Sequence, residues 1–379
     1  MKQALIFKER KVSWLELFFD LVFVTAVAST THLLLAVDHH PEHTLLYFGE
    51  YLLMVTPMFW AWVGQTMFFN RFGERISFPA FYMLPQMFFL VLMTASFDLD
   101  FDDTFYTFII GYAGIRLITV LQYFIVSHKV GEQLRQVARL LGTIFLIGIL
   151  LSLSAVFFTG VLRYSIVYMG IAIDILLPLV FTKTLQKAPV HLSHLIERFG
   201  LFVIITFGES IVAITTLLVG HTTDPYTLSF TLAAFLIIGT MWASYFYSFE
   251  HHLDPTKTTS GQVLLYGHFF IIVSVMLLAA NIHLLYAGHL EKNTLLLLLY
   301  GAAAVFFLAK QVVFNYHKKP EVIFDIWKDL LLFSLLIFFF ILNVFIILPL
   351  WSNFIFLWLV TLVDLLIRFQ ASRHIQTEK

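Results

Sequence analysis

The sequence contains no cysteine and few charged residues. Of its 379 residues, 12% are Asp, Glu, Lys or Arg, and the formal net charge is −1. Without thiols the chain forms no disulfide, no thiolate metal site and no cysteine nucleophile. A protein that binds nucleic acid needs a basic surface to neutralise phosphates, so this charge argues against such a partner.

Enzyme signatures are missing as well. The chain has no Gly-rich phosphate loop, no His-Glu-x-x-His and no Gly-x-Ser-x-Gly motif. Its polar stretches are too short to hold a soluble catalytic domain. The HHPEH stretch at 39–43 has clustered imidazoles but lacks the fixed ligand spacing of a known metal site. We therefore expect no enzyme, no cofactor, no metal site and no ATP-driven pumping by this chain alone.

Hydrophobic residues dominate what is present. They make up 60% of the sequence, and Phe alone occurs 43 times. This composition predicts a multi-pass protein of the lipid bilayer with an all-α, transmembrane helical bundle. A span needs about 20 apolar residues. Division at the polar stretches gives twelve spans, at 14–37, 46–69, 78–97, 104–127, 138–159, 161–183, 198–219, 226–249, 262–287, 294–315, 327–348 and 350–369.

The distribution of Lys and Arg predicts the orientation. Basic residues concentrate in the N-terminal segment and in every second connection after it, whereas the opposite connections carry only Arg163 and Lys292 and include the acidic stretch 97–103. Because positive residues stay in the cytoplasm, we expect both termini there. The basic N-terminus runs into the first span without a small-residue cleavage site, so we interpret this segment as a span and not as a cleaved signal peptide.

The sequence pattern repeats after 180 to 190 residues. Glu16-Leu17-Phe18 corresponds to Glu197-Arg198-Phe199, and Asp174 corresponds to Asp364. Gln122, His128, Lys129 and Glu132 return, in order, as Gln311, His317, Lys318 and Glu321. Six is an even number of spans, so both halves enter from the same side. We predict two parallel six-helix repeats, 1–187 and 188–379.

Four ionisable residues inside the spans are candidates for a transport path: Asp20, Arg116, Asp174 and Glu209. A charged side chain at the centre of a membrane helix costs about 2.5–3.5 kcal/mol, and such residues are usually functional. Glu209 lies about 18 Å along the helix from Glu197, near the bilayer midplane. Arg116 and Asp174 lie at a similar depth. We therefore predict that Arg116 pairs with Asp174, with Glu209 or with both.

Five further residues support this path: Glu16, His32, Glu197, Ser210 and Asp364. Glu16 can equally form a capping box with Ser13 at the start of a helix. His32 can relay protons or bond across helices. Asp364 has no obvious cation, and we expect it near the cytoplasmic end of its span.

The repeat predicts that the two halves place charge differently. The residue at the position of Arg116 in the second half is near Val305, and the counterpart of Glu209 is Ala28. Both counterparts are apolar. We therefore expect the halves to have diverged around one asymmetric pathway.

Three segments carry a resemblance to a known family. SWLELFFDLVFV at 13–24, WAWVGQTMFFNR at 60–71 and ERFGLFVIITFGESIVAI at 197–214 resemble segments of the bacterial low temperature requirement A family. The resemblance covers essentially the whole chain and implies a bacterial inner-membrane protein of a family linked to growth in the cold. It implies no particular substrate. A weaker likeness is to endolysosomal potassium and proton channels, whose first span opens with Phe-Ser-Asp, where this chain has Phe18-Phe19-Asp20.

These observations favour a permease for an ion, proton or cation, or for a small solute, with a charged path between the two halves. Two alternatives stay open. One is a two-repeat cation channel, which differs by fast, passive and selective flux. The other is a non-transporting protein that organises or senses lipid during growth in the cold. The sequence predicts no oligomeric state.

Overall fold

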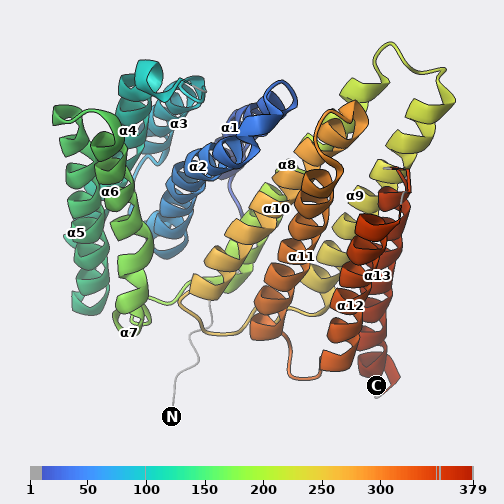
Figure 1. The fold of residues 1–379 in the computed structure, drawn as a ribbon. Coiled ribbons are helices and arrows are strands. Elements are labelled where there is room, and N and C mark those ends of the chain that lie inside the picture. Colours follow the sequence, from blue (N-terminus) through green and yellow to red (C-terminus); the bar gives the residue numbers. More distant parts are fainter. Residues whose placement is uncertain (1–10, 99, 347, 350, 378–379) are drawn as a thin grey trace. The chain divides into compact units, whose positions relative to one another are not determined.

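The computed structural model describes residues 11–98, 100–346, 348–349 and 351–377. These residues form helices and connections, without a strand longer than one isolated bridge. Figure 1 shows the helices in chain order. The long ones are α1 (Trp14–Leu35), α2 (Thr44–Phe72), α3 (Ala80–Ala95), α4 (Phe101–Ser127), α5 (Glu132–Ser154), α6 (Gly160–Val180), α8 (Leu192–Leu218), α9 (Pro225–His251), α10 (Gln262–Ala287), α11 (Lys292–His317), α12 (Ile326–Phe345) and α13 (Ser352–Thr377).

Each of the twelve expected spans corresponds to one long helix, so the predicted all-α fold is confirmed. Among the described residues, eleven helices are long and apolar enough to cross a membrane. The exception is α3, whose 16 residues extend about 24 Å, less than the roughly 30 Å of a hydrocarbon core. The one-turn helix α7 (Thr182–Leu185) and four short 3-10 helices, including η3 (Gly73–Arg75), lie in the connections.

Acidic side chains fix where several helices begin. Asp100 caps α4 by accepting a hydrogen bond from the Asp103 amide at 3.3 Å. Asp224 caps α9 by accepting bonds from the Thr227 amide at 2.9 Å and hydroxyl at 2.6 Å. These bonds favour the carboxylate and lower the pKa of Asp224 below its ordinary value. The polar residues between the apolar segments therefore start the next helix.

The chain packs as two compact units. Unit 1 comprises 1–33, 50–201 and 256–265, and unit 2 comprises 34–49, 202–255 and 266–379. In unit 1, α3, α4, α5 and α6 pack against one another in chain order. In unit 2, α13 packs against α9 and α12, and α11 packs against α12. The repeat boundary at residue 187 stays a prediction, since packing defines these units.

Helix α2 is deeply buried. The most apolar part of the α2 segment is 83% buried, the highest share among the eleven spans. Two glycines allow close approach there. A Cβ on Gly64 of α2 would lie 2.3 Å from Arg116 Nη1, and a Cβ on Gly148 of α5 would lie 2.2 Å from Asp174 Oδ1. These glycines make room for a buried ion pair.

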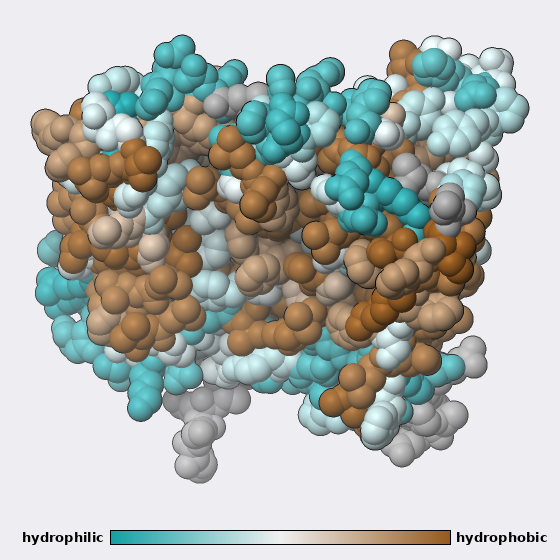
Figure 2. Space-filling view, in the orientation of Figure 1, coloured by the Kyte–Doolittle hydropathy of each residue, from teal (hydrophilic) through white to brown (hydrophobic). Residues whose placement is uncertain are grey.

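Apolar side chains also cover the outer surfaces of the helices. In Figure 2, brown residues cover the middle of the α5–α6 face and teal residues gather towards the helix ends. Ile147 and Leu150 of α5 and Leu176 of α6 are 49–57% exposed. Soluble proteins rarely expose large apolar areas, so this surface is typical of contact with lipid.

Candidate functional site

The first turn of α1 carries a capping box. The Ser13 amide donates to Glu16 Oε2 at 2.9 Å, and the Glu16 amide donates to Ser13 Oγ at 3.3 Å. The predicted capping box of Ser13 and Glu16 is therefore confirmed. Glu16 is nevertheless only 1% exposed, and its other carboxylate oxygen faces the interior. The residue has a second contact that capping does not explain.

That contact is with Arg198 of α8. Arg198 is fully buried and places Nη1 3.1 Å from Glu16 Oε1 and Nη2 2.5 Å from Asp20 Oδ1. Glu16 and Asp20 are four residues apart on one face of α1, so a single guanidinium reaches both. Arg198 Nη2 also donates to Thr66 Oγ1 of α2 at 3.2 Å. Among the described residues, the Arg198 guanidinium thus contacts two buried carboxylates at once.

Asp20 has one well-bonded oxygen and one bare oxygen. Oδ1 accepts from Arg198 and also from Trp62 Nε1 of α2 at 2.6 Å. Oδ2 is buried and accepts no hydrogen bond from the residues that the structure describes. A buried acceptor left unsatisfied costs about 1–3 kcal/mol. A proton or a small cation on Oδ2 removes that cost.

His194 extends the cluster along α8. It is fully buried, with Nε2 3.2 Å from Glu16 Oε1 and Nδ1 3.1 Å from Asn70 Nδ2. Asn70 Oδ1 accepts the His191 amide at 2.9 Å, which assigns Nδ2 as the donor to His194. His194 Nδ1 therefore accepts the hydrogen bond from Asn70, and Nε2 lies on the side of Glu16. A chain of polar groups thus runs from Asn70 through His194 to the carboxylates.

Arg116 of α4 and Asp174 of α6 form a second cluster, and the pairing predicted for them is confirmed. Arg116 Nη2 and Nε lie 2.6 and 2.9 Å from Asp174 Oδ2, and the Tyr112 hydroxyl donates to the same oxygen at 3.2 Å. The guanidinium lies over the Phe145 ring at 4.3 Å. Asp174 Oδ1 accepts no hydrogen bond from the described residues, and it abuts Gly148. Here one cation serves one carboxylate.

Helix α2 contacts both clusters with opposite faces. Trp62 and Thr66 bond to the first cluster, whereas Gly64 and the Trp60 carbonyl, 3.4 Å from Arg116 Nη1, face the second. Residues two apart on a helix point about 200° apart, and residues four apart share a face. The sequence of α2 therefore places two ionic clusters on either side of one helix.

A third cluster lies in unit 2 and corrects one expectation. Asp364 of α13 is fully buried and pairs with Lys310 of α11, while its Oδ1 lies 3.2 Å from Arg368 Nε. Ser244 of α9 also donates to Asp364, and Arg368 Nη2 lies 2.8 Å from Asp329 Oδ1 of α12. The expectation that Asp364 has no cation is wrong, because Lys310 and Arg368 both contact its carboxylate. Two cations balance two carboxylates.

This cluster places a cation in the second half close to the position where the repeat offset points to the apolar Val305, whereas the asymmetry expected between Glu209 and Ala28 stays a prediction. In chain order α4 and α11 are the fourth long helices of their halves, and α6 and α13 are the sixth. Both halves pair a cation on the fourth helix with an aspartate on the sixth. Lys310 stands five residues after Val305, roughly 7.5 Å along the helix, so a fixed repeat offset does not find it.

The remaining candidates differ in their exposure. The side chains of Glu197 and His32 are exposed. Glu209 and Ser210 are buried on the part of α8 that belongs to unit 2, and their role in a path stays a prediction. The repeat aligned Glu197 with Glu16, yet the neighbouring Arg198 is the residue that faces the interior.

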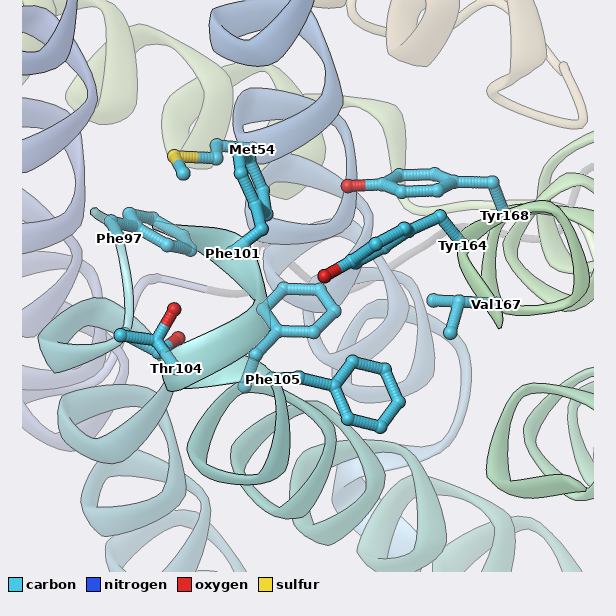
Figure 3. A pocket seen from close by; sticks show the side chains of 10 residues that line it. Met54, Phe97, Phe101, Thr104, Phe105, Tyr164, Val167 and Tyr168 are labelled. Atoms are coloured by element: carbon cyan, nitrogen blue, oxygen red, sulfur yellow. The ribbon is translucent and has the colours of Figure 1, made fainter. Parts of the chain in front are cut away.

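An aromatic pocket between α4 and α6 is too small for a solute. Figure 3 shows Phe97, Phe101, Phe105, Tyr164 and Tyr168 around it. The cavity has a volume of about 10 Å³, and one water needs about 10–15 Å³. This pocket is therefore not a substrate site.

Comparison with known proteins agrees with the sequence motifs. The family model described as bacterial low temperature requirement A protein (LtrA) matches residues 11–366, nearly the whole chain. The chain belongs to this family. The uncharacterized protein RA0937 of Rhizobium meliloti (strain 1021) is 25% identical over 300 residues, which cover 72% of this chain and 69% of that protein. The resemblance inferred from the three segments is confirmed.

In this LtrA family member, sequence reasoning missed Arg198, Trp62, His194 and Lys310 as partners of the candidate acids. A signal existed for two of them. His194 and Arg198 are four residues apart at the start of an apolar helix, so they share one face. A buried cation in a span needs a carboxylate partner. Glu16 and Asp20 are also four residues apart, so the two faces could have been matched from the sequence.

Proposed function

We propose that the protein transports protons or monovalent cations across a membrane, and that Asp20 binds the ion in a site completed by Glu16 and Arg198. The observation that carries this proposal is the bare, buried oxygen of Asp20 beside a guanidinium that is shared with a second carboxylate. Hydrocarbon surroundings penalise such an arrangement unless an ion is bound. As proposed, the protein is a permease and not an enzyme.

In this proposal, Arg198 couples ion binding to motion. With Asp20 ionised, Arg198 of α8 is held by two charges on α1. A proton on Asp20 removes one of these charges, and the contact between α1 and α8 keeps only the pair with Glu16. Release of the proton restores the second contact. The relative stability of two helix arrangements then depends on occupancy, as alternating access requires.

The other two clusters have different roles in this proposal. Arg116–Asp174 and the Lys310–Asp364–Arg368–Asp329 network each contain as many cations as carboxylates. Such balanced sets hold helices together. If all three clusters only hold helices, the protein is the non-transporting alternative, and no ion gradient is dissipated.

Three further features belong to the proposal. The matching ion pairs at Asp174 and Asp364 support two parallel six-helix repeats. The Lys and Arg bias supports an inner-membrane protein with both termini in the cytoplasm. Reporter fusions at the C-terminus test this: a reporter active only in the cytoplasm is expected to be active, and an inactive fusion places the C-terminus outside.

Flux into liposomes tests the transport proposal. Purified protein is reconstituted with a pH-sensitive dye inside, and K⁺, Na⁺ or pH gradients are imposed. We expect wild-type protein to dissipate at least one gradient and Asp20→Asn to lose that flux. The control Glu132→Gln changes an exposed acid by the same charge and is expected to keep it.

Two results decide against the proposal. Undiminished flux in Asp20→Asn removes Asp20 from the path. No flux by wild-type protein under any gradient favours the lipid-linked alternative. Glu209→Gln, measured in the same assay, determines whether the predicted path also includes that residue.

A further inference from the structure

A basic cavity of about 320 Å³ lies in unit 1 where α2 ends and α5 begins. Three separate segments line it: the end of α2 with η3, the first turn of α5, and the connection from α7 to α8. Its charged lining residues are Arg71, Glu74, Arg75 and Lys187. Three cations and one carboxylate give the cavity an excess of positive charge. Its volume is at the lower end of the roughly 300–1,000 Å³ found for small-molecule sites.

The inner wall of the cavity is held rigidly. Arg71 Nε donates to the Ala188 carbonyl at 3.0 Å, and its Nη2 donates to the Ser260 carbonyl at 2.8 Å. Asn70 binds the backbone of His191 from both ends of its amide, each at 2.9 Å. These bonds fix the connection against the end of α2. The cavity therefore exists before any ligand binds, which reduces the entropy cost of binding.

The outer cations are available to a ligand. Arg75 is exposed and has no ion pair or side-chain hydrogen bond within the described part of the chain. Lys187 is exposed as well, and its ammonium contacts the Gln136 amide oxygen at 3.0 Å, without a carboxylate partner among the described residues. A guanidinium and an ammonium at one cavity match the oxygens of a phosphoryl group.

We propose that this cavity binds a phosphoryl group, carried either by an anionic lipid headgroup or by a free phosphate, through Arg71, Arg75 and Lys187. Basic pockets between membrane helices suit such headgroups. The lining residues Phe72 and Leu134 provide apolar contact beside the cations. Glu74 repels an anionic ligand, but the three cations of the lining outnumber this one carboxylate.

The position of the cavity indicates a regulatory role. Asn70, which lines the cavity, also contacts His194 at 3.1 Å, and His194 lies 3.2 Å from Glu16. A ligand that moves the His191 connection thus acts on the Asp20 cluster through one asparagine. This regulatory step rests on the proposed function, whereas phosphoryl binding does not.

Binding is tested with the double variant Arg75→Gln/Lys187→Gln of the full chain. Both side chains are exposed, so the fold is expected to persist, and circular dichroism checks this. The matched control is Arg139→Gln/Lys183→Gln, which removes two exposed cations from α5 and α7 outside the cavity. Titration calorimetry with inorganic phosphate at constant ionic strength measures the free anion. Melting temperature in vesicles of phosphatidylcholine, with or without equal phosphatidylglycerol, measures the headgroup.

We expect the double variant to bind at least about tenfold more weakly than wild type and the control to bind normally. Weakened phosphate binding identifies a free anion as the ligand. A phosphatidylglycerol-dependent rise in melting temperature that only the double variant loses identifies a lipid headgroup. The proposal is overturned if neither probe binds wild type, or if the control loses as much binding as the double variant. Because these readouts do not use flux, a failed transport assay leaves them intact.

Discussion

Replacing Arg198 with Met is expected to destabilise the protein severely. Met fills apolar space without offering a charge, so Glu16 and Asp20 lose the guanidinium that contacts both. Removing one partner of a buried ion pair costs about 3–5 kcal/mol. Since Arg198 serves two carboxylates and also donates to Thr66, we expect the upper end of that range, about 5 kcal/mol.

The assay is thermal unfolding of the detergent-purified protein, followed by circular dichroism of the helices. The matched control is Arg135→Met. Arg135 pairs with Glu132 at 3.3 Å, but the two side chains are 37% and 68% exposed. Solvent screens such a pair, which contributes about 0–1 kcal/mol. Arg135 also donates to the Ser127 and Val130 carbonyls at 3.1 and 3.4 Å, and each such hydrogen bond contributes about 0.5–1.5 kcal/mol. The control should therefore lose much less stability than Arg198→Met.

A triple variant separates lost charge balance from lost packing. Glu16→Gln, Asp20→Asn and Arg198→Met together remove the formal charges of Arg198 and of the two carboxylates that it contacts. Replacing a whole buried ionic set by neutral groups is often nearly neutral in stability, so the triple variant should regain most of the loss. The reasoning is refuted if Arg198→Met melts like Arg135→Met, or if the triple variant is no more stable than the single one.

Three other perturbations follow from the packing. Gly64→Ala places a Cβ 2.3 Å from Arg116 Nη1 and is expected to lower stability by about 1–3 kcal/mol in the same assay. Lys310→Met is expected to cost about 3 kcal/mol by removing one cation from Asp364, and adding Asp364→Leu should restore most of it. Burial and nearby positive charge lower the pKa of His252 from 6.5 to about 3. In the unfolded chain the His252 imidazole therefore binds a proton more readily than in the folded protein. As pH falls from 6.5 towards 3, His252 is expected to lower the free energy of unfolding by at most about 1.4 kcal/mol per pH unit. Denaturant titrations at several pH values measure this slope.

Each of these has an internal comparison. Gly49→Ala also adds a methyl group within α2, but nothing lies within 4 Å of that position, so it should be neutral or slightly stabilising. Equal losses at positions 64 and 49 contradict the close contact with Arg116. His252→Gln should flatten the acid slope, whereas His251→Gln, at an exposed neighbour, should not. If the Lys310 and Asp364 double variant melts no higher than the single variant, charge balance is not what this cluster provides.

Much of the fold followed from local pattern. Apolar runs separated by polar residues located all twelve long helices, since a helix in lipid must satisfy its backbone internally. Ser13-x-x-Glu16 located the start of α1 through its capping box. Counting residues from the helix ends placed Arg116 and Asp174 at one depth, and they do pair. Rise per residue gives depth, and depth reduced the expected partners of Arg116 to Asp174 and Glu209.

The sequence by itself determined the fold class, the helix order, the family and the presence of carboxylates inside the spans. Only the tertiary structure decided which cation each carboxylate meets. Arg198 contacts Glu16 across 182 residues of chain, and Lys310 contacts Asp364 although the repeat offset points to Val305. The physical reason is that helical periodicity fixes the height and face of a side chain on its own helix. The neighbour that this face meets depends on how all the helices pack together.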